Sequence, residues 1–436
     1  MEKENSFHTS FDNIQHNNIP FIAQIITKAK ACCCDRTWPR IAGILMNIIK
    51  QNKEALKKEC YIGLPDDLPC LRALVWKINL RYLSTDVNKW ETSIPKKRKE
   101  YIDIKNAFML RFKAEIEIFQ EVESNRMRTS ITEEEKNNVI LLSKNTDREL
   151  LETIDKDVNR THMNFDFFSK PIKENEMMTQ EELDKMLNRK RNCTYQDFKT
   201  VYTKGRGDIN MTISNETHAD VLGRILYIYS KLNKDVSYVQ GMNEILAPIY
   251  YCYSIGNFDN TSTEYIEADT YWSFSNLMED IKGMFIKEKD NDKTGIFNKI
   301  NLFEKVIEKC EKSIYKQLKK YDVSVMHFSF RWFNLFFGQD FMMPDILRLW
   351  DTVFSELDRF YFIYFLSLAV LKWKKKEILK SDFFGIINCL QTIECDDIEQ
   401  LIEMGIKIKQ EHEKKVRNII YDKEAKQVLN INNKNI

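Results

Sequence analysis

Two short segments, 80 residues apart when counted from Arg160 to Gln240, carry side chains suited to phosphate chemistry. The first runs from Ile154 to Arg160 and the second from Tyr238 to Gly241. Hydrolysis of a nucleotide γ-phosphate needs a cation for the developing negative charge and a polar group that orients the attacking water. Arginine suits the first role because its planar guanidinium binds pairs of oxygen atoms and stays charged. A chain with both groups could complete the unfinished active site of a partner.

Each segment also has an ordinary structural interpretation. On a helix, Asp157 and Arg160 are three residues apart and can form an ion pair that holds the guanidinium in one pose. Exposed pairs of this kind are common and contribute little to stability. Gln240 and Gly241 fit a polar turn, in which Tyr238 would be a core anchor. Taken alone, neither motif distinguishes a catalytic site from a surface feature.

Apolar periodicity indicates that helices position these side chains. Between residues 222 and 232 the apolar residues recur at intervals of three and four, which is typical of an amphipathic helix. This helix is expected to end near Lys234, which leaves Gln240 in the turn that follows. The apolar stretch Ile245–Tyr250 then begins another helix. Few segments alternate with period two, and only 12 glycines and 8 prolines are available for hairpin turns. The sequence therefore predicts an all-α fold.

Composition excludes several classes of protein. The 436 residues are 43% hydrophobic and 12% aromatic, enough for a large core or two halves with continuous cores. The 66 basic and 65 acidic residues argue against a dedicated nucleic-acid binder, which would show a basic excess. The longest apolar run, Phe360–Leu371, is shorter than the roughly 20 residues of a transmembrane helix, so we expect a buried helix there.

No secretory signal or metal-ligand spacing is visible in the sequence. We therefore expect a cytoplasmic protein whose ten cysteines are reduced thiols, with no metal site and no transmembrane segment.

The chain divides on composition into four expected parts. Residues 1–60 form a prefix with one helix from about Ile41 to Leu56, residues 61–260 carry both motifs, residues 261–412 form a second helical half, and residues 413–436 are a tail. Residues 170–217 are long and charged and suggest an insertion on the surface. The basic run Lys96–Lys99, at a helix start after Pro95, is expected to be a solvated surface.

Several motifs, in this order, resemble the TBC domain family, whose members are GTPase-activating modules for Rab proteins. Arg72 and Trp76 match its opening Arg-x-x-x-Trp. The two chemical segments match its Ile-x-x-Asp-x-x-Arg and Tyr-x-Gln-Gly fingerprints. Three C-terminal signatures follow, at Phe330–Trp332, Phe341–Asp345 and Arg348–Asp351. The resemblance covers about residues 60 to 410. Residues 224–251 and 267–270 are most similar to the subgroup that contains TBC domain family member 13.

The resemblance implies a role for each matching residue. Arg160 would be the catalytic arginine finger and Gln240 the glutamine finger, and both would enter the nucleotide site of the Rab. Asp157 would position Arg160 from behind, while Tyr238 and Gly241 would shape the glutamine loop. The remaining motif residues would be structural: Ile154, Arg72, Trp76, Trp350 and Asp351.

The resemblance also implies a V-shaped all-α domain of two helical subdomains, with both fingers in the N-terminal one. The partner would be a GTP-bound Rab, and the chain would need no cofactor of its own because the Rab carries GTP and Mg²⁺. Contact with membranes would be peripheral, transient on endomembranes and mediated by the Rab. A rival interpretation is a scaffold that binds a Rab without catalysis. Family members of that kind commonly lack one finger, and this chain has both.

Overall fold

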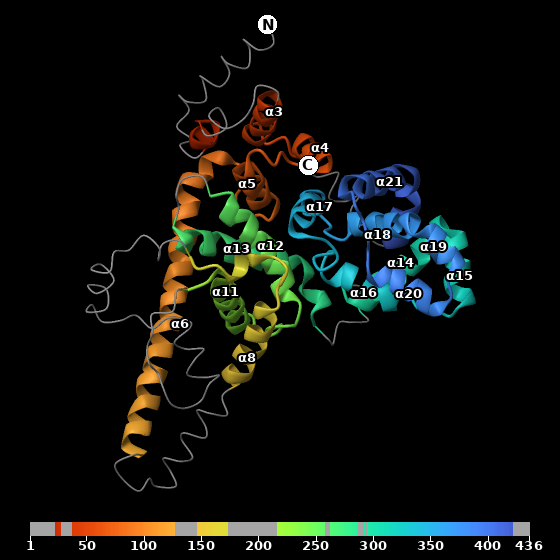
Figure 1. The fold of residues 1–436 in the computed structure, drawn as a ribbon. Helices are drawn as coiled ribbons and strands as arrows, with labels where there is room; N and C mark the ends of the chain where they lie inside the picture. Colours follow the sequence, from red (N-terminus) through yellow and green to blue (C-terminus); the bar gives the residue numbers. More distant parts are fainter. Residues whose placement is uncertain are drawn as a thin grey trace, which may run out of the picture. The chain divides into compact units, whose positions relative to one another are not determined.

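The computed structural model describes residues 22–27, 37–126, 146–172, 216–257, 262–286, 292 and 294–421, without the side chains of residues 109–126 and 146–148. Helices dominate these ranges, as Figure 1 shows, and the described residues contain no strand. One isolated antiparallel bridge joins Pro171 to Thr217. The predicted all-α class is confirmed.

The first compact unit comprises residues 1–42 and 67–276. Its helices are α5 (Pro69–Asn79), α6 (Trp90–Arg126), α8 (Thr146–Asn159), α11 (His218–Leu232), α12 (Met242–Ile255) and most of α13 (Thr263–Ile281), with the short 3-10 segments η1 (Val87–Lys89) and η2 (Asp166–Ser169). Helix α11 packs against α8 and α12, and α12 also packs against α5 (Figure 1). The largest fully buried side chains in this unit are Trp76, Trp90, Tyr101, Tyr227, Tyr250 and Phe274.

The second unit comprises residues 43–66 and 277–436. It contains part of α3 (Trp38–Ile49), then α4 (Lys53–Ile62), η4 (Lys282–Met284), α14 (Ile296–Cys310), α15 (Lys312–Lys320), α16 (Met326–Asn334), α17 (Met343–Ser355), α18 (Tyr361–Trp373), α19 (Lys375–Lys380), α20 (Phe383–Gln391) and α21 (Ile398–Ile420). Helix α18 is buried from Tyr361 to Leu371, which confirms the buried helix predicted from the apolar run. None of the helices in the described ranges is long and apolar enough to span a bilayer.

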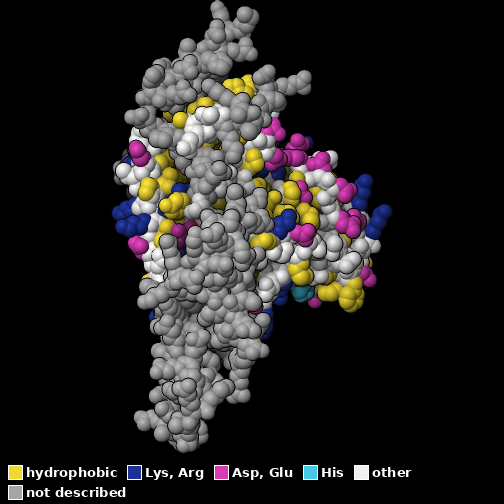
Figure 2. All heavy atoms as spheres, turned by 60° about the vertical axis from the view of Figure 1, so that its left-hand side comes forward, with side chains coloured by type: hydrophobic (Ala, Val, Ile, Leu, Met, Phe, Trp, Pro, Cys, Tyr) yellow, Lys and Arg dark blue, Asp and Glu magenta, His cyan; other side chains and the backbone are white. Residues whose placement is uncertain are grey.

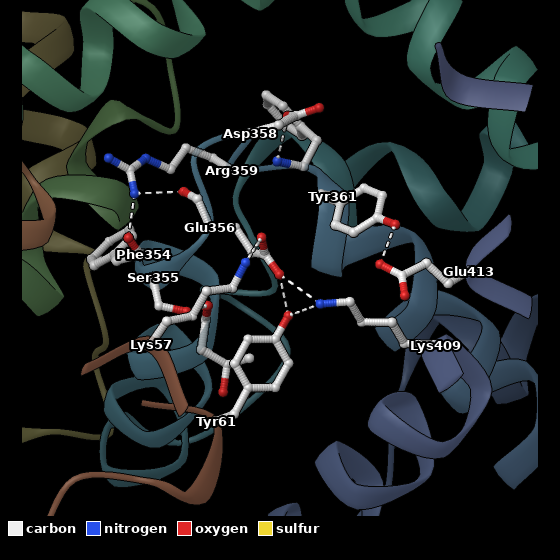
Figure 3. A network of polar contacts seen from close by, with 12 residues as sticks. Lys57, Tyr61, Phe354, Ser355, Glu356, Asp358, Arg359, Tyr361, Lys409 and Glu413 are labelled. Carbon is white, nitrogen blue, oxygen red and sulfur yellow. Dashed lines mark hydrogen bonds and ion pairs between the residues drawn. The ribbon is translucent and has the colours of Figure 1, made fainter. Parts of the chain in front are cut away.

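A polar network holds α4 within the second unit (Figure 3). The buried carboxylate of Glu356 accepts hydrogen bonds from Lys57 Nζ at 2.6 Å and from Lys409 Nζ at 2.9 Å. The hydroxyl of Tyr61 also donates to Glu356, and Lys409 Nζ lies 2.6 Å from the same hydroxyl oxygen. Because three donors share one carboxylate, its burial is compensated and α4 is fixed to α17 and α21.

The structure differs from the sequence-based expectation near the N-terminus. The single helix expected from Ile41 to Leu56 is two helices, α3 and α4. The break follows from local geometry: Gln51 has a left-handed φ of 55°, and the side chain of Asn52 caps α4 by accepting from Ala55 N. Residues 43–60, expected in the prefix, cluster with the second unit, and α21 continues to Ile420. Most of the expected 170–217 insertion lies outside the described residues.

Candidate active site

Arg160 is the first residue after α8, and its guanidinium is held by the aspartate one helical turn before it. Arg160 Nη2 lies 2.6 Å from Asp157 Oδ1. Half of the arginine side chain (50%) is exposed, whereas only 5% of the aspartate side chain is. A buried carboxylate therefore orients a cation whose other face is open to solvent.

The second oxygen of Asp157 reaches the other motif. Tyr238 Oη donates a hydrogen bond of 2.6 Å to Asp157 Oδ2, across 81 residues of sequence. Burial raises the pKa of the Tyr238 hydroxyl well above its ordinary value, and the hydrogen bond to Asp157 raises it further, so this hydroxyl keeps its proton and remains a donor. One carboxylate thus joins the arginine motif to the glutamine motif.

The loop between α11 and α12 presents Gln240. Gly241 has φ 102° and ψ −15° at the N-cap of α12, a left-handed conformation that side chains with a Cβ rarely adopt. Met242 N donates to Val239 O at 3.1 Å, which closes a turn around Gln240. Gln240 itself is exposed, while Gly241 and Met242 are buried. The loop therefore holds its backbone against the core and leaves the amide accessible.

Two further residues, absent from the sequence-based set, connect the motifs. Asn243, on the first turn of α12, donates from Nδ2 to Thr161 Oγ1 at 2.8 Å and to the Asp157 carbonyl at 3.3 Å. Thr161 Oγ1 in turn donates to the same carbonyl at 2.9 Å. Both side chains are buried. The one available signal in the sequence was the polar pair Asn243 and Glu244 directly before the apolar stretch Ile245–Tyr250.

His162 makes a sharp turn directly after this segment. It adopts a left-handed φ of 43°, and its Nε2 lies 3.4 Å from Glu244 Oε2 without hydrogen-bond geometry. Burial lowers the pKa of His162 to about 4, so the ring is neutral at pH 7. The ring stacks on Phe168 of η2 at a centroid distance of 6.2 Å. These contacts fix the chain immediately after the arginine.

The motif residues with expected structural roles in the first unit lie in its interior. Ile154 is fully buried on α8, three residues before Asp157. Arg72 and Trp76 stand one turn apart on α5, and both are buried. All three residues are buried, so they pack within this unit.

Trp350 and Asp351 belong to α17 in the second unit, and both are buried. Trp350 Nε1 donates to the Phe336 carbonyl at 2.9 Å. Asp351 Oδ2 accepts from Leu64 N at 3.0 Å and so binds the segment that follows α4. Each satisfies a polar group in the interior of that unit.

Comparison with known proteins finds a matching family model and similar sequences. The model of the Rab-GTPase-TBC domain family matches residues 173–379. The matched range includes Tyr238, Gln240 and Gly241 and begins after Arg160. TBC1 domain family member 13 of Mus musculus is 29% identical over 375 residues, which is 80% of this chain and 92% of that protein. Its Homo sapiens counterpart is 29% identical over 385 residues, 82% of this chain and 94% of that protein.

A solved structure resembles the fold as well. The crystal structure of the Ypt/Rab-GAP domain of Gyp1p superposes with a TM-score of 0.57 at 20% identity and covers 90% of this chain and 99% of that one. At this identity the likeness concerns the fold alone. By the family model and by relatives along most of its length, the chain is similar to the Rab-GTPase-TBC domain family.

Proposed function

We propose that this protein is a GTPase-activating protein for Rab-family small GTPases, with Arg160 and Gln240 as its two catalytic fingers. One observation carries the assignment. The buried carboxylate of Asp157 contacts both the Arg160 guanidinium and the Tyr238 hydroxyl, two residues before Gln240. The two exposed side chains therefore project from one hydrogen-bonded assembly within the first unit.

Each finger would supply a different part of the reaction. The guanidinium would neutralise charge that develops between the β- and γ-phosphates, and the Gln240 amide would orient water for in-line attack. The protein would form no covalent intermediate. An arginine finger contributes on the order of 10³ to 10⁵ in rate, which corresponds to roughly 4 to 7 kcal/mol of transition-state stabilisation. The ion pair with Asp157 restricts the rotamers of Arg160 before the Rab binds, so less conformational entropy is lost on binding.

The nucleotide and Mg²⁺ would come with the Rab, so the substrate is the GTP-bound partner and not free GTP. The protein would act in the cytoplasm and reach endomembranes while its Rab is there. Tyr238, Gly241 and Asp157 would hold the two fingers in place, and the buried motif residues would support the helices behind them.

The decisive experiment measures single-turnover GTP hydrolysis by a panel of Rabs with the parent, Arg160→Ala, Arg160→Lys and Gln240→Ala. We expect Arg160→Ala to lose at least about 10³-fold of the stimulation. Arg160→Lys should recover little, because lysine lacks the planar fork. Lys156→Ala is the matched control, since Lys156 is exposed on α8 four residues before Arg160. Equal stimulation by parent and Arg160→Ala would disprove the finger assignment.

A second measurement separates catalysis from scaffolding. A catalyst must bind the transition state more tightly than the ground state. The affinity for the GDP-bound Rab should therefore rise when aluminium fluoride is added, and Arg160→Ala should remove that increase. A protein that preferred the plain GTP-bound Rab would instead be a scaffold.

A further inference from the structure

We propose that the second unit carries a binding surface for anionic membranes, independent of any Rab. The surface, termed here the basic corner, is formed by exposed side chains of α15, α19 and the first turn of α20: Lys312, Lys316, Lys320, Leu379, Lys380 and Phe384.

Hydrogen bonds bring the three helices together at this corner. Gln317 Nε2, on α15, donates to the Leu379 carbonyl at 3.2 Å and to the Ser381 carbonyl at 3.0 Å. Lys316 and Lys320 flank Gln317 on α15, while Lys380 lies between the two accepting carbonyls. The last turn of α15 is therefore adjacent to the end of α19 and the start of α20, and their lysines share one region of the surface.

The charge at this corner departs from that of the whole chain. Residues 312–322 and 374–384 contain eight lysines and three carboxylates, whereas the whole chain has a net charge of +1. On the face drawn in Figure 2, basic and acidic side chains are interspersed over the described surface. In these two segments, five exposed lysines have no carboxylate within ion-pair distance among the residues that the structure describes: the four lysines of the basic corner and Lys376.

The arrangement on α15 opposes helix stability. Lys312, Lys316 and Lys320 follow one another at intervals of four and form a single row, opposite the buried Ile314 and Leu318. Like charges at this interval destabilise a helix. Lys320 at the C-terminal end is favoured by the helix dipole, but Lys312, at the N-terminal end, is disfavoured by it. A helix shaped for its own stability would not have this row, whereas an anionic partner would offset its cost.

Hydrophobic side chains are exposed beside the lysines. Phe384 is 79% exposed and Leu379 is 40% exposed. Phe384 packs edge-on against Phe383 at 5.4 Å. The carboxylate of Asp382, which lies between Lys380 and these rings, is used as the helix cap, since it accepts from Gly385 N at 3.0 Å. Aromatic and aliphatic groups beside lysines are the combination that binds the interface of an anionic bilayer.

The lysines favour a lipid surface over a protein partner. They are point charges on flexible stems and are spread in a row along the surface. A negatively charged leaflet attracts such a set without geometric matching, and each lysine close to it strengthens binding by about fivefold. The partner is therefore a bilayer containing acidic phospholipid.

The test is co-sedimentation of the full chain with vesicles, in the absence of any Rab, so that its result is independent of the proposed catalytic function. The vesicles contain either phosphatidylcholine alone or phosphatidylcholine with about one quarter phosphatidylserine. We expect binding only to the second, weakening as salt is raised because exposed charges are screened. The triple variant Lys316→Gln, Lys320→Gln, Lys380→Gln should bind at least about tenfold more weakly. Phe384→Ser should weaken binding by a smaller factor.

A second triple variant is the matched control. Lys53, Lys414 and Lys415 are exposed in the same unit but outside the corner, so Lys53→Gln, Lys414→Gln, Lys415→Gln changes net charge equally. This control should bind as the parent does. Equal loss in both triple variants, or no preference of the parent for acidic vesicles, would overturn the proposal. Retention on immobilised polyglutamate without vesicle binding would also overturn it, in favour of an acidic protein partner.

Discussion

The first unit contains two kinds of buried carboxylate. On α13, Asp269 accepts from Lys77 at 2.7 Å and from both Arg98 Nε and Nη2, at 2.9 and 2.8 Å. Burial by itself raises the pKa of Asp269, but the neighbouring cations Lys77 and Arg98 lower it by more, so the net shift of this pKa is downward. The Arg98 side chain is only 14% exposed. Asp157 contacts an arginine too, but that arginine is 50% exposed.

Glu267, also on α13, is likewise a buried carboxylate paired with a buried arginine, an arrangement termed here a closed pair; the pair of Asp157 with the half-exposed Arg160 is termed an open pair. Arg224 donates to it from Nε at 2.7 Å and from Nη2 at 2.6 Å, and its third nitrogen contacts Glu216. The Arg224 side chain is 8% exposed. An arginine whose nitrogen atoms are used internally holds the fold together. The Arg160 side chain makes one ion pair among the residues that the structure describes and faces solvent, so it keeps donors for a partner. The same ion-pair chemistry thus serves stability in one place and recognition in the other.

The largest expected effect is a difference in the free energy of unfolding between variants at Arg224 and at Arg160. Arg224→Met leaves Glu267 buried and uncompensated, so we expect the free energy of unfolding to fall by about 3 to 5 kcal/mol. Arg160→Ala should lower it by no more than about 1 kcal/mol, because the guanidinium is half exposed and the Tyr238 hydroxyl still donates to Asp157. Urea denaturation of both variants measures the difference. Similar losses in the two variants would remove the distinction between closed and open pairs.

The next prediction concerns Asp157, the buried partner of Arg160. Asp157→Asn keeps the size of the side chain but removes the charge that orients Arg160 and one acceptor of the site. Because small displacements of catalytic groups are costly, we expect stimulation of GTP hydrolysis to fall by roughly 100-fold. Asp155→Asn, on the partly exposed part of α8, is the control and should have little effect. Single-turnover rates at saturating protein would show whether the loss is in the chemical step; an unchanged rate would assign Asp157 to packing alone.

The pH dependence of stability should differ between the two buried histidines, His162 and His218, and the buried carboxylates of α13. Burial lowers the pKa of His162 and of His218 from 6.5 to about 4. Below pH 6.5 the unfolded chain therefore binds more protons than the folded one, and stability falls as the pH drops from 6.5 to 4. We expect a loss of about 1 to 3 kcal/mol. The carboxylates of α13 act at lower pH, because the pKa of Glu267 and of Asp269 is shifted downward, against the upward effect of burial.

His162→Asn tests this assignment, since asparagine tolerates the left-handed φ of 43°. Thermal unfolding between pH 7 and pH 4 should show a shallower loss in the variant, with the remaining slope due to His218. An unchanged slope would exclude His162 as a contributor.

Local spacing predicted what lies within one turn of chain. The ion pair of Asp157 with Arg160 follows from their separation of three residues, and the turn at Gln240 follows from the end of an apolar periodicity. The helical class followed from apolar periodicity and from the scarcity of glycine and proline. These features depend on neighbours in sequence, so the sequence contains the information directly.

Contacts between distant segments could not be predicted in this way. Arg98, within a basic run expected to be solvated, binds the buried Asp269 across 171 residues. The hydrogen bond of Tyr238 to Asp157 and that of Asn243 to Thr161 likewise cross more than 80 residues. The type of a charged or polar residue does not specify its partner, because the partner is set by how helices that are distant in sequence pack together.

The smallest predicted effect concerns the hydrogen bond between the two motifs. Tyr238→Phe keeps the ring and removes the hydroxyl that donates to Asp157 Oδ2. A bond to a charged acceptor contributes about 1.5 to 3 kcal/mol, but Arg160 still compensates Asp157, so we expect a loss near the lower limit. Stimulation should therefore fall about tenfold, with parallel losses for all responsive Rabs. In a double-mutant cycle with Asp157→Asn, the second change should add little, since both remove one interaction. Additive losses would mean that Tyr238 supports Gln240 without Asp157, and the two motifs would then act as separate parts.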